Sequence, residues 1–290
     1  MASSDQWIVD DWRSADVAGL YEKYGGLMLR RALDEREMDL IEHAFEWRIA
    51  NPGPNATRMY PGADFLIFQE TANSWAEPNF APVLDDTQAP DIVSKIFRTG
   101  PVWFMGEQLW MKEGAARRTP WHQDGASVPF EGKKTLTMWI ALDDLPQEAV
   151  LELVLGSHRG PIYSLTGFDP DDDTEPMYHH PDFPRIPDIE AQREKWDIAG
   201  TSTKRGDILV FHTDTLHGGA VTWPGLKRRT LSLRFFGDDA VRKFIPENTS
   251  ELYQETQAPE AEDQVLTTRF MKVPLGEPLH TAKGVPQVRP

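Results

Sequence analysis

The sequence contains no cysteine among its 290 residues. Disulfides, thiolate metal sites and cysteine nucleophiles are therefore excluded. A metal ion, if the chain binds one, must be held by nitrogen and oxygen ligands.

Long apolar runs are also absent. No segment approaches the roughly 18 consecutive apolar residues that a membrane span needs. The N-terminus, MASSDQWIVDDW, has no basic stretch followed by an apolar run, so the sequence predicts no secretory signal. We therefore expect a cytoplasmic protein that does not enter a membrane.

Basic residues are outnumbered by acidic ones, with 30 Lys and Arg against 46 Asp and Glu and a formal net charge of −16. This balance disfavours a surface for nucleic acid or for anionic membranes. It does not exclude small anionic substrates, because a local group of arginines can override the global field. The expected partner is a small-molecule substrate, and the oligomeric state stays open.

Aromatic residues are plentiful, with 10 Trp and 14 Phe in a chain that is 40% hydrophobic. This composition is sufficient to bury a sizeable core. Between about residues 100 and 240, short strand-like runs such as TLTMWIALDD, LELVLGSH and RTLSLRFF are separated by Gly, Pro and Asp clusters. The pattern predicts a mainly β fold, as a sandwich, a barrel or a jelly roll.

The N-terminal flank, about residues 10–50, has a helical pattern instead. Ser14 is the expected N-cap and Gly25 the expected stop of a first helix, and DEREMDLIEHAFEWRIA has the apolar spacing of a second. Between them, GGLMLRRAL is compatible with a short strand. Residues 51–100 show no clear period and receive no assignment.

One domain spanning residues 1–290 is the simplest organisation. Residues from about 164 to 193 are acidic and rich in proline (GFDPDDDTEP, HHPDFPRIPD), which predicts a long surface insertion. Residues from about 246 to 290 are polar with scattered prolines, and we expect a partly ordered tail there.

The stretch TPWHQDG places His122 and Asp124 two positions apart. In a strand, residues i and i+2 project from the same face, so both side chains would point to one spot. Such a pair is weak on its own, because short matches occur by chance.

Residues 204–236 supply a third candidate metal ligand and two arginines that could bind a carboxylate. They run from a Gly-Asp turn through an apolar strand to His217, which two glycines follow, and then to a strand that begins with two arginines. Two histidines and one carboxylate on one face of a metal are the arrangement of non-heme Fe(II) oxygenases, which keep the opposite positions open. A guanidinium fork suits the distal carboxylate of a 2-oxo acid that chelates the iron.

Taken in order, WHQD, MWIALDD, GSHRG, GDILVFH, LHGG and RRTLSLRFF resemble the phytanoyl-CoA dioxygenase family of Fe(II)/2-oxoglutarate oxygenases over roughly residues 20–240. The resemblance implies a double-stranded β-helix, a jelly-roll or cupin-like core, flanked by N-terminal α-helices. It also implies Fe(2+) as the cofactor and 2-oxoglutarate and O2 as co-substrates.

Position by position, the resemblance makes three residues the iron ligands and the catalytic centre: His122, Asp124 and His217. Arg228, eleven positions after the distal histidine, falls where the family places its 2-oxoglutarate arginine. The other residues expected to line the co-substrate pocket are Gln108, Thr137 and Trp139.

Two departures from the family pattern concern loops beside the site. PQEAVLELVL replaces the usual Asn-Gly turn before GSH, with Leu155 in place of a proline, and AVTWPG replaces the polar pair that often follows the distal histidine. Both departures leave the iron ligands intact and bear on the shape of the substrate loops.

Other polar residues have simpler explanations beside a site role. His212 is expected to be a strand-end histidine, with metal ligation as its alternative, and His158 a loop residue held by backbone hydrogen bonds. For the remaining candidates, a solvated or structural position stands beside contact with substrate: Lys112, Arg117, Arg118, His179 and His180.

The predicted function is that of a dioxygenase that hydroxylates a small organic metabolite and releases succinate and CO2, with desaturation or rearrangement as other outcomes of the same chemistry. Two alternatives remain: a non-catalytic cupin-like jelly-roll protein that binds a metal or ligand, and a hydrolase whose zinc has the same three ligands. Halogenation is disfavoured because related halogenases have a small residue where this chain has Asp124. Fold and iron site do not specify the substrate, although aromatic residues in the candidate loops suggest a moderately apolar one.

Overall fold

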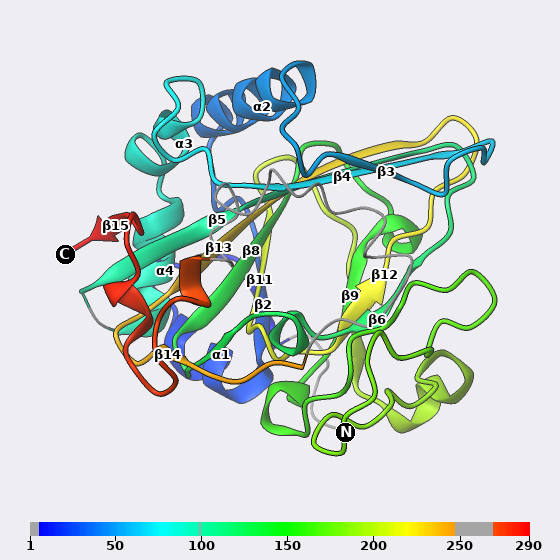
Figure 1. The fold of residues 1–290 in the computed structure, drawn as a ribbon. Coiled ribbons are helices and arrows are strands. Elements are labelled where there is room, and N and C mark those ends of the chain that lie inside the picture. Colours follow the sequence, from blue (N-terminus) through cyan, green and yellow to red (C-terminus); the bar gives the residue numbers. More distant parts are fainter. Residues whose placement is uncertain (1–5, 99, 247–268) are drawn as a thin grey trace.

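The computed structural model describes residues 6–98, 100–246 and 269–290. Three layers follow one another across Figure 1: helices on one side, a large sheet in the middle, and a small sheet that faces it. Two sheets facing each other are the architecture of a jelly roll, as the sequence predicts.

The two sheets draw on distant parts of the chain. The large sheet has the strand order β1 (Ile8–Val9), β2 (Gly26–Leu29), β11 (Ile208–Phe211), β8 (Thr135–Ala141), β13 (Lys227–Phe236), β5 (Val102–Glu113), β4 (Leu66–Ala72) and β3 (Thr57–Met59), and β15 (Gln287–Arg289) also pairs with β5. The small sheet has the order β10 (Ile198–Ala199), β9 (Leu151–Val154), β12 (His217–Gly219) and β6 (Thr119–His122). A separate ribbon pairs β14 (Val241–Arg242) with β7 (Phe130–Glu131).

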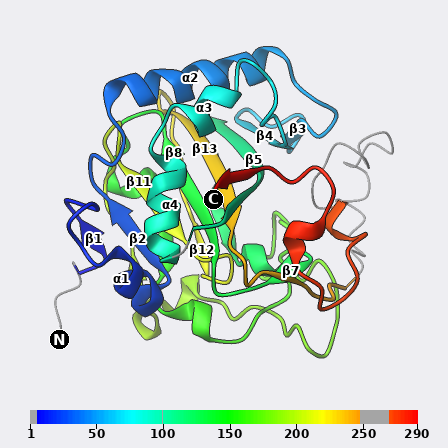
Figure 2. The ribbon, with the colours of Figure 1, turned by 90° about the vertical axis from the view of Figure 1, so that its left-hand side faces the viewer.

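Helices cover the outer face of the large sheet. Figure 2 shows α1 (Val17–Tyr24), α2 (Glu35–Ala50), α3 (Ala81–Asp85) and α4 (Ala89–Phe97) in front of it. Strand β8 is buried along its whole length. On one face, residues such as Leu136 and Met138 pack in a core with residues of the helices. On the other face, Thr137 contacts Asp124 beside the small sheet. The site therefore lies between the two sheets.

The predicted N-terminal elements are confirmed, with one correction. The second helix is α2, and a capping box between Asp34 and Glu37 fixes its start. The first helix ends at Gly25, whose φ of 72° suits glycine. Its N-cap is Asp16, which accepts a hydrogen bond from the Gly19 N–H; Ser14 instead hydrogen-bonds Asp11, so its assignment as the cap is wrong.

Residues 51–100 contain β3, β4, α3 and α4, although their sequence shows no clear helical or strand periodicity. The β3–β4 hairpin adds to an edge of the large sheet. The second residue of both α3 and α4 is a proline, which suits the first helical turn. Part of the predicted tail, residues 247–268, lies outside the described residues. Residues 269–290 return to the core, where β15 pairs with β5.

Residues 164–193, all of which the structure describes, contain no strand. They nevertheless bury apolar side chains in two small clusters beside the small sheet, including Met177, Tyr178, Ile186 and Ile189. We keep the name insertion for residues 164–193. None of the described helices is both long enough and apolar enough to cross a membrane.

Candidate active site

Adjacent strands of the small sheet bring the two predicted histidines together. His217 on β12 is the register partner of His122 on β6, and the centroids of their rings lie 4.1 Å apart. Gly218 permits this approach, since a Cβ at that position would lie 3.1 Å from the backbone oxygens of Thr119 and Pro120. The glycine pair after His217 thus has a packing reason.

Asp124 reaches the same point by a different route from the one predicted. The strand ends at His122, and Asp124 begins the 3-10 turn η1 (Asp124–Ala126), so strand parity does not place it. Its Oδ1 still lies 3.8 Å from His217 Nε2. One ligand atom from each of His122, Asp124 and His217 lies within 4.8 Å of the others, which is the spacing of a shared metal ion.

Backbone carbonyls fix which nitrogen of each histidine faces the centre. His122 Nδ1 lies 2.8 Å from the Pro120 carbonyl oxygen, and His217 Nδ1 lies 2.9 Å from that of Thr215. A carbonyl can only accept, so each Nδ1 carries the proton and donates it. Both Nε2 atoms are then unprotonated and available to a metal.

The second oxygen of Asp124 is held from the large sheet. Thr137 donates its hydroxyl to Oδ2 at 3.0 Å, and Arg234 Nε lies 3.5 Å from the same atom. Burial would raise the pKa of Asp124, but Arg234 and the two histidines outweigh burial and hold this pKa at about 2. Asp124 is therefore a carboxylate with Oδ1 free for a metal.

Burial lowers the pKa of His217 to about 3, with His122 adding to the effect, and burial also lowers the pKa of His122. His217 stays neutral well below neutral pH, and burial favours the neutral form of His122 in the same direction, as metal ligation requires. The unfolded chain has ordinary histidines with a pKa of about 6.5, so below that pH it binds protons that the folded protein excludes. Stability should consequently fall as the pH falls.

We expect the melting temperature of the metal-free protein to drop by several degrees between pH 7 and pH 5. His217→Gln should flatten this drop, whereas the control His43→Gln, on the exposed face of α2, should keep it. Scanning calorimetry across this range tests the expectation. A wild-type melting temperature that is constant or rises toward pH 5 would contradict it.

Arg228 is buried without an anion. Its guanidinium carbon lies 5.2 Å from the ring centre of Trp139, and no carboxylate of the described residues pairs with it. Its Nε has no hydrogen-bond partner, nor has the buried hydroxyl of Thr230, which lies two positions along the same face of β13. Burial lowers the pKa of Arg228 to about 9.

A buried cation without a partner is costly, and the residues here fit an absent dicarboxylate. Arg228 and Thr230 offer donors at one end, and the triad offers two imidazoles and one carboxylate as metal ligands at the other. The neighbouring Arg229 differs, because it lies on the opposite face and pairs with Asp143 at 2.8 Å.

The remaining predicted pocket residues lie between these ends. Thr137 contacts Asp124, Trp139 lies against Arg228, and Gln108 accepts a hydrogen bond from Arg234 at 2.6 Å. The sequence interpretation assigned no role to Arg234 or Thr230. Both residues could have been found from the alternation in RRTLSLRFF, in which the polar side chains from Arg228 to Arg234 lie on one face of the strand.

The candidate histidines His212 and His158 make their hydrogen bonds to residues outside the triad. His212 Nε2 lies 3.1 Å from both the Thr135 hydroxyl and the Gly132 carbonyl oxygen, and His158 contacts the Glu22 carbonyl oxygen. Neither histidine is in the cluster of possible metal ligands among the described residues. Both have the structural positions that the sequence favoured.

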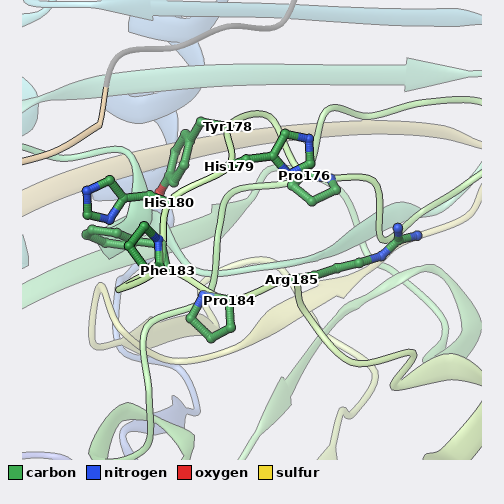
Figure 3. A pocket seen from close by; sticks show the side chains of 8 residues that line it. Pro176, Tyr178, His179, His180, Phe183, Pro184 and Arg185 are labelled. Atoms are coloured by element: carbon green, nitrogen blue, oxygen red, sulfur yellow. The ribbon is translucent and has the colours of Figure 1, made fainter.

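His179 and His180 line a surface pocket of about 410 Å³ in the insertion. Figure 3 shows them with Phe183 and Arg185. No triad residue lines this pocket, so its size does not identify it with the metal centre. A substrate role for the two histidines stays a hypothesis.

Comparison with known proteins agrees with this geometry. The phytanoyl-CoA dioxygenase (PhyH) family matches residues 21–221. A probable alpha-ketoglutarate-dependent hypophosphite dioxygenase of Stutzerimonas stutzeri is 25% identical over 152 residues, which are 47% of this chain and 48% of that protein. The match thus spans about half the length of the curated relative.

Solved structures share the fold over nearly the whole chain. The epimerase SnoN from nogalamycin biosynthesis, in complex with Fe3+, alpha ketoglutarate and nogalamycin RO, gives a TM-score of 0.66 at 18% identity, covering 94% of this chain and 97% of SnoN. The carbocyclase SnoK from the same biosynthesis gives 0.65 at 17% identity, covering 93% and 95%.

These likenesses confirm the jelly-roll fold class, while the family match covers the strands that carry His122 and His217 and the turn that carries Asp124. The chain belongs to the phytanoyl-CoA dioxygenase family of Fe(II)- and 2-oxoglutarate-dependent oxygenases.

Proposed function

We propose that this chain is an Fe(II)- and 2-oxoglutarate-dependent dioxygenase that hydroxylates a small organic molecule and releases succinate and CO2. The observation that carries the proposal is Arg228, a buried arginine without an anion, in the same inter-sheet space as the His122, Asp124 and His217 cluster. The chemistry of a zinc hydrolase or of an inert metal-binding jelly roll does not by itself require a buried arginine whose Nε lacks a partner among the described residues, whereas 2-oxoglutarate binding does require a cation for the distal carboxylate.

Each residue has a role that its contacts support. His122 Nε2, Asp124 Oδ1 and His217 Nε2 would hold the metal. Arg228 and Thr230 would receive the distal carboxylate of 2-oxoglutarate, and Trp139 would keep water from that end. Bound together, iron(II), 2-oxoglutarate and O2 supply an oxidant strong enough for an unactivated C–H bond.

The protein contributes by positioning and by excluding water. Thr137 and Arg234 hold Asp124 Oδ2, so that the carboxylate would offer only Oδ1 to a metal. Since Asp124 fills the carboxylate position, no site for a halide ligand is left there, and oxygenation is the outcome that this ligand set favours.

The names of the relatives suggest three other reactions: oxidation of hypophosphite, epimerisation and ring closure. Hypophosphite is a small anion; of the two arginines nearest in sequence to His122, Arg117 pairs with Asp173, whereas Arg118 lies 3.1 Å from Glu190 with neither terminal nitrogen hydrogen-bonded among the described residues. Epimerisation and ring closure would use the same oxidant and differ from hydroxylation in the steps after hydrogen abstraction. The identity of the product decides between them.

The test is 2-oxoglutarate binding by anaerobic calorimetry, followed by succinate release with Fe(II) and O2 over a panel of metabolites. We expect stoichiometric 2-oxoglutarate binding, succinate release with Fe(II) but not with Zn(II), and a hydroxylated product. Asp124→Ala is the control that should release no succinate. Metal binding without 2-oxoglutarate binding would overturn the proposal and favour the non-catalytic jelly-roll protein.

A further inference from the structure

Three segments that are distant in sequence meet beside His122. They are the β3–β4 hairpin, the loop between β5 and β6, and the insertion. Phe168 of the insertion is the contact point, because its ring centroid lies 5.9 Å from that of His122. A molecule that approaches the triad along this side of His122 must touch the Phe168 ring or displace it.

Tyr60 of the hairpin holds Phe168 in place. The Tyr60 hydroxyl donates to the Phe168 carbonyl oxygen at 2.9 Å, and the Arg117 guanidinium lies 5.8 Å from the centre of the Tyr60 ring. Arg117 also donates to the carbonyl oxygen of Asp169 at 3.2 Å. We call Tyr60, Phe168 and Arg117 the gate.

The space behind the gate is small, and Lys112, Arg117, Arg118 and Thr119 line it together with an apolar wall. No triad residue lines it, and Phe168 is the lining residue that lies beside His122. The apolar wall is formed by Met59, Tyr60, Ile67, Trp110, Pro120 and Phe168. The cavity has a volume of about 10 Å³, which is the room that one water molecule needs. An organic substrate can therefore be seated here only if the gate widens.

The backbone at the gate is strained in a way that favours widening. Tyr60 and Phe168 have φ angles of 53° and 55°, a left-handed region that aromatic residues rarely adopt. Strain of this kind gathers at ligand clamps and switch regions. Opening would break the hydrogen bond from Tyr60 to Phe168 and would allow both residues to relax.

Carboxylates lie beside both arginines of this space. Arg117 forms an ion pair with Asp173, and Arg118 lies 3.1 Å from Glu190, although neither terminal nitrogen of Arg118 has a hydrogen-bond partner among the described residues. Lys112 donates its three protons to oxygens of Arg117, Thr119 and Ala220 at 2.9 to 3.1 Å. A small oxyanion would compete with Asp173 or Glu190 for these arginines, whereas an apolar ring would replace only apolar contacts and water.

We propose that Phe168 is a specificity-determining residue and that the substrate of this enzyme carries an apolar ring, which packs against Phe168 beside His122. The inference rests on the proposed function, because it places the substrate next to the metal. It adds the substrate class and the residue that selects it.

The experiment measures ligand binding rather than turnover. Protein loaded with Co(II) and 2-oxoglutarate under anaerobic conditions is titrated with 1-indanol, 2-naphthol and cyclohexylmethanol as ring-bearing probes, and with inorganic phosphate as the oxyanion. The visible absorption of Co(II) and the heat of binding report association. We expect the best ring probe to bind at least about tenfold more tightly than phosphate, a difference of about 1.4 kcal/mol.

Two variants assign the effect to Phe168. Phe168→Ala should weaken the best ring probe at least about tenfold, and Phe168→Leu, which keeps apolar bulk, should weaken it less. Phe183→Ala is the matched control, since Phe183 belongs to the same insertion but packs against Tyr178. Neither substitution at position 168 should change 2-oxoglutarate affinity, which also shows that the variants fold.

Three results would overturn the inference: phosphate binding more tightly than every ring probe, no binding of any ring probe, or equal effects of Phe168→Ala and Phe183→Ala. In each case intact binding of Co(II) and 2-oxoglutarate leaves the proposed function standing. Failure of the wild-type protein to bind 2-oxoglutarate is a different result, which overturns the proposed function and the inference with it.

Discussion

Replacing His217 with alanine should abolish tight iron binding and, with it, all 2-oxoglutarate turnover. Loss of residues that only orient a metal ligand commonly costs 10–100-fold in affinity, so loss of the ligand itself should cost more than about 100-fold. His217 is one of the three side chains whose ligand atoms lie within 4.8 Å of one another. Calorimetric titration with Fe(II), or with Co(II) in air, measures the change.

His212→Ala is the matched control, since both histidines follow the same Gly-Asp turn. His212 contacts Thr135 and Gly132 and is not in the ligand cluster. Its removal should lower the melting temperature, because buried polar groups lose a partner, and should leave the stoichiometry and affinity of the metal unchanged. Wild-type metal affinity in His217→Ala, together with metal loss in His212→Ala, would show that the assignment is reversed.

Arg228→Ala should weaken 2-oxoglutarate affinity by at least about 30-fold while iron binding changes little. Removing one partner of a buried, hydrogen-bonded charge pair costs about 2–5 kcal/mol, and about 1.4 kcal/mol corresponds to a factor of ten. The arginine is buried beside Trp139 and has no carboxylate partner among the described residues, so the loss should fall on the co-substrate. Titration of metal-loaded protein with 2-oxoglutarate gives the affinity.

Arg229→Ala is the matched control, which tests whether the loss of any arginine from this strand weakens 2-oxoglutarate binding or only the loss of Arg228. The Arg229 guanidinium pairs with Glu42, Glu46 and Asp143 at 2.7 to 2.8 Å, away from the triad. The substitution should reduce stability, because it removes the link between α2 and β13, and should leave 2-oxoglutarate affinity near the wild-type value. A larger affinity loss in Arg229→Ala than in Arg228→Ala would refute the assignment of the co-substrate arginine.

The substrate remains the least constrained part of the function, and the gate explains why. The proposed metal ligands come from two strands of the jelly roll and from the turn that follows β6, within the segment that the family match covers. The wall that we propose to meet the substrate comes from the β3–β4 hairpin and the insertion, which lie outside those strands. Functional variation in such folds is carried by loops on a constant scaffold.

Much of the site was predictable from the sequence because its signals are local. The H-x-D pair, the glycines after His217 and the polar alternation after Arg228 are each read within a few residues. The period of two along a strand assigns Arg228 and Arg229 to opposite faces without any knowledge of the fold. The helix α2 was predictable for the same reason, since its capping box and apolar spacing lie within one segment.

The tertiary structure decided what depends on contacts between distant segments. It placed Asp124 in a turn rather than in the strand, and it supplied Thr137 and Arg234 from the large sheet to hold its second oxygen. It also joined Tyr60 to Phe168 across 108 positions of the chain. Such contacts leave no periodic trace in the sequence, because each depends on how whole sheets and loops pack together; only the folded chain brings the insertion to the side of His122.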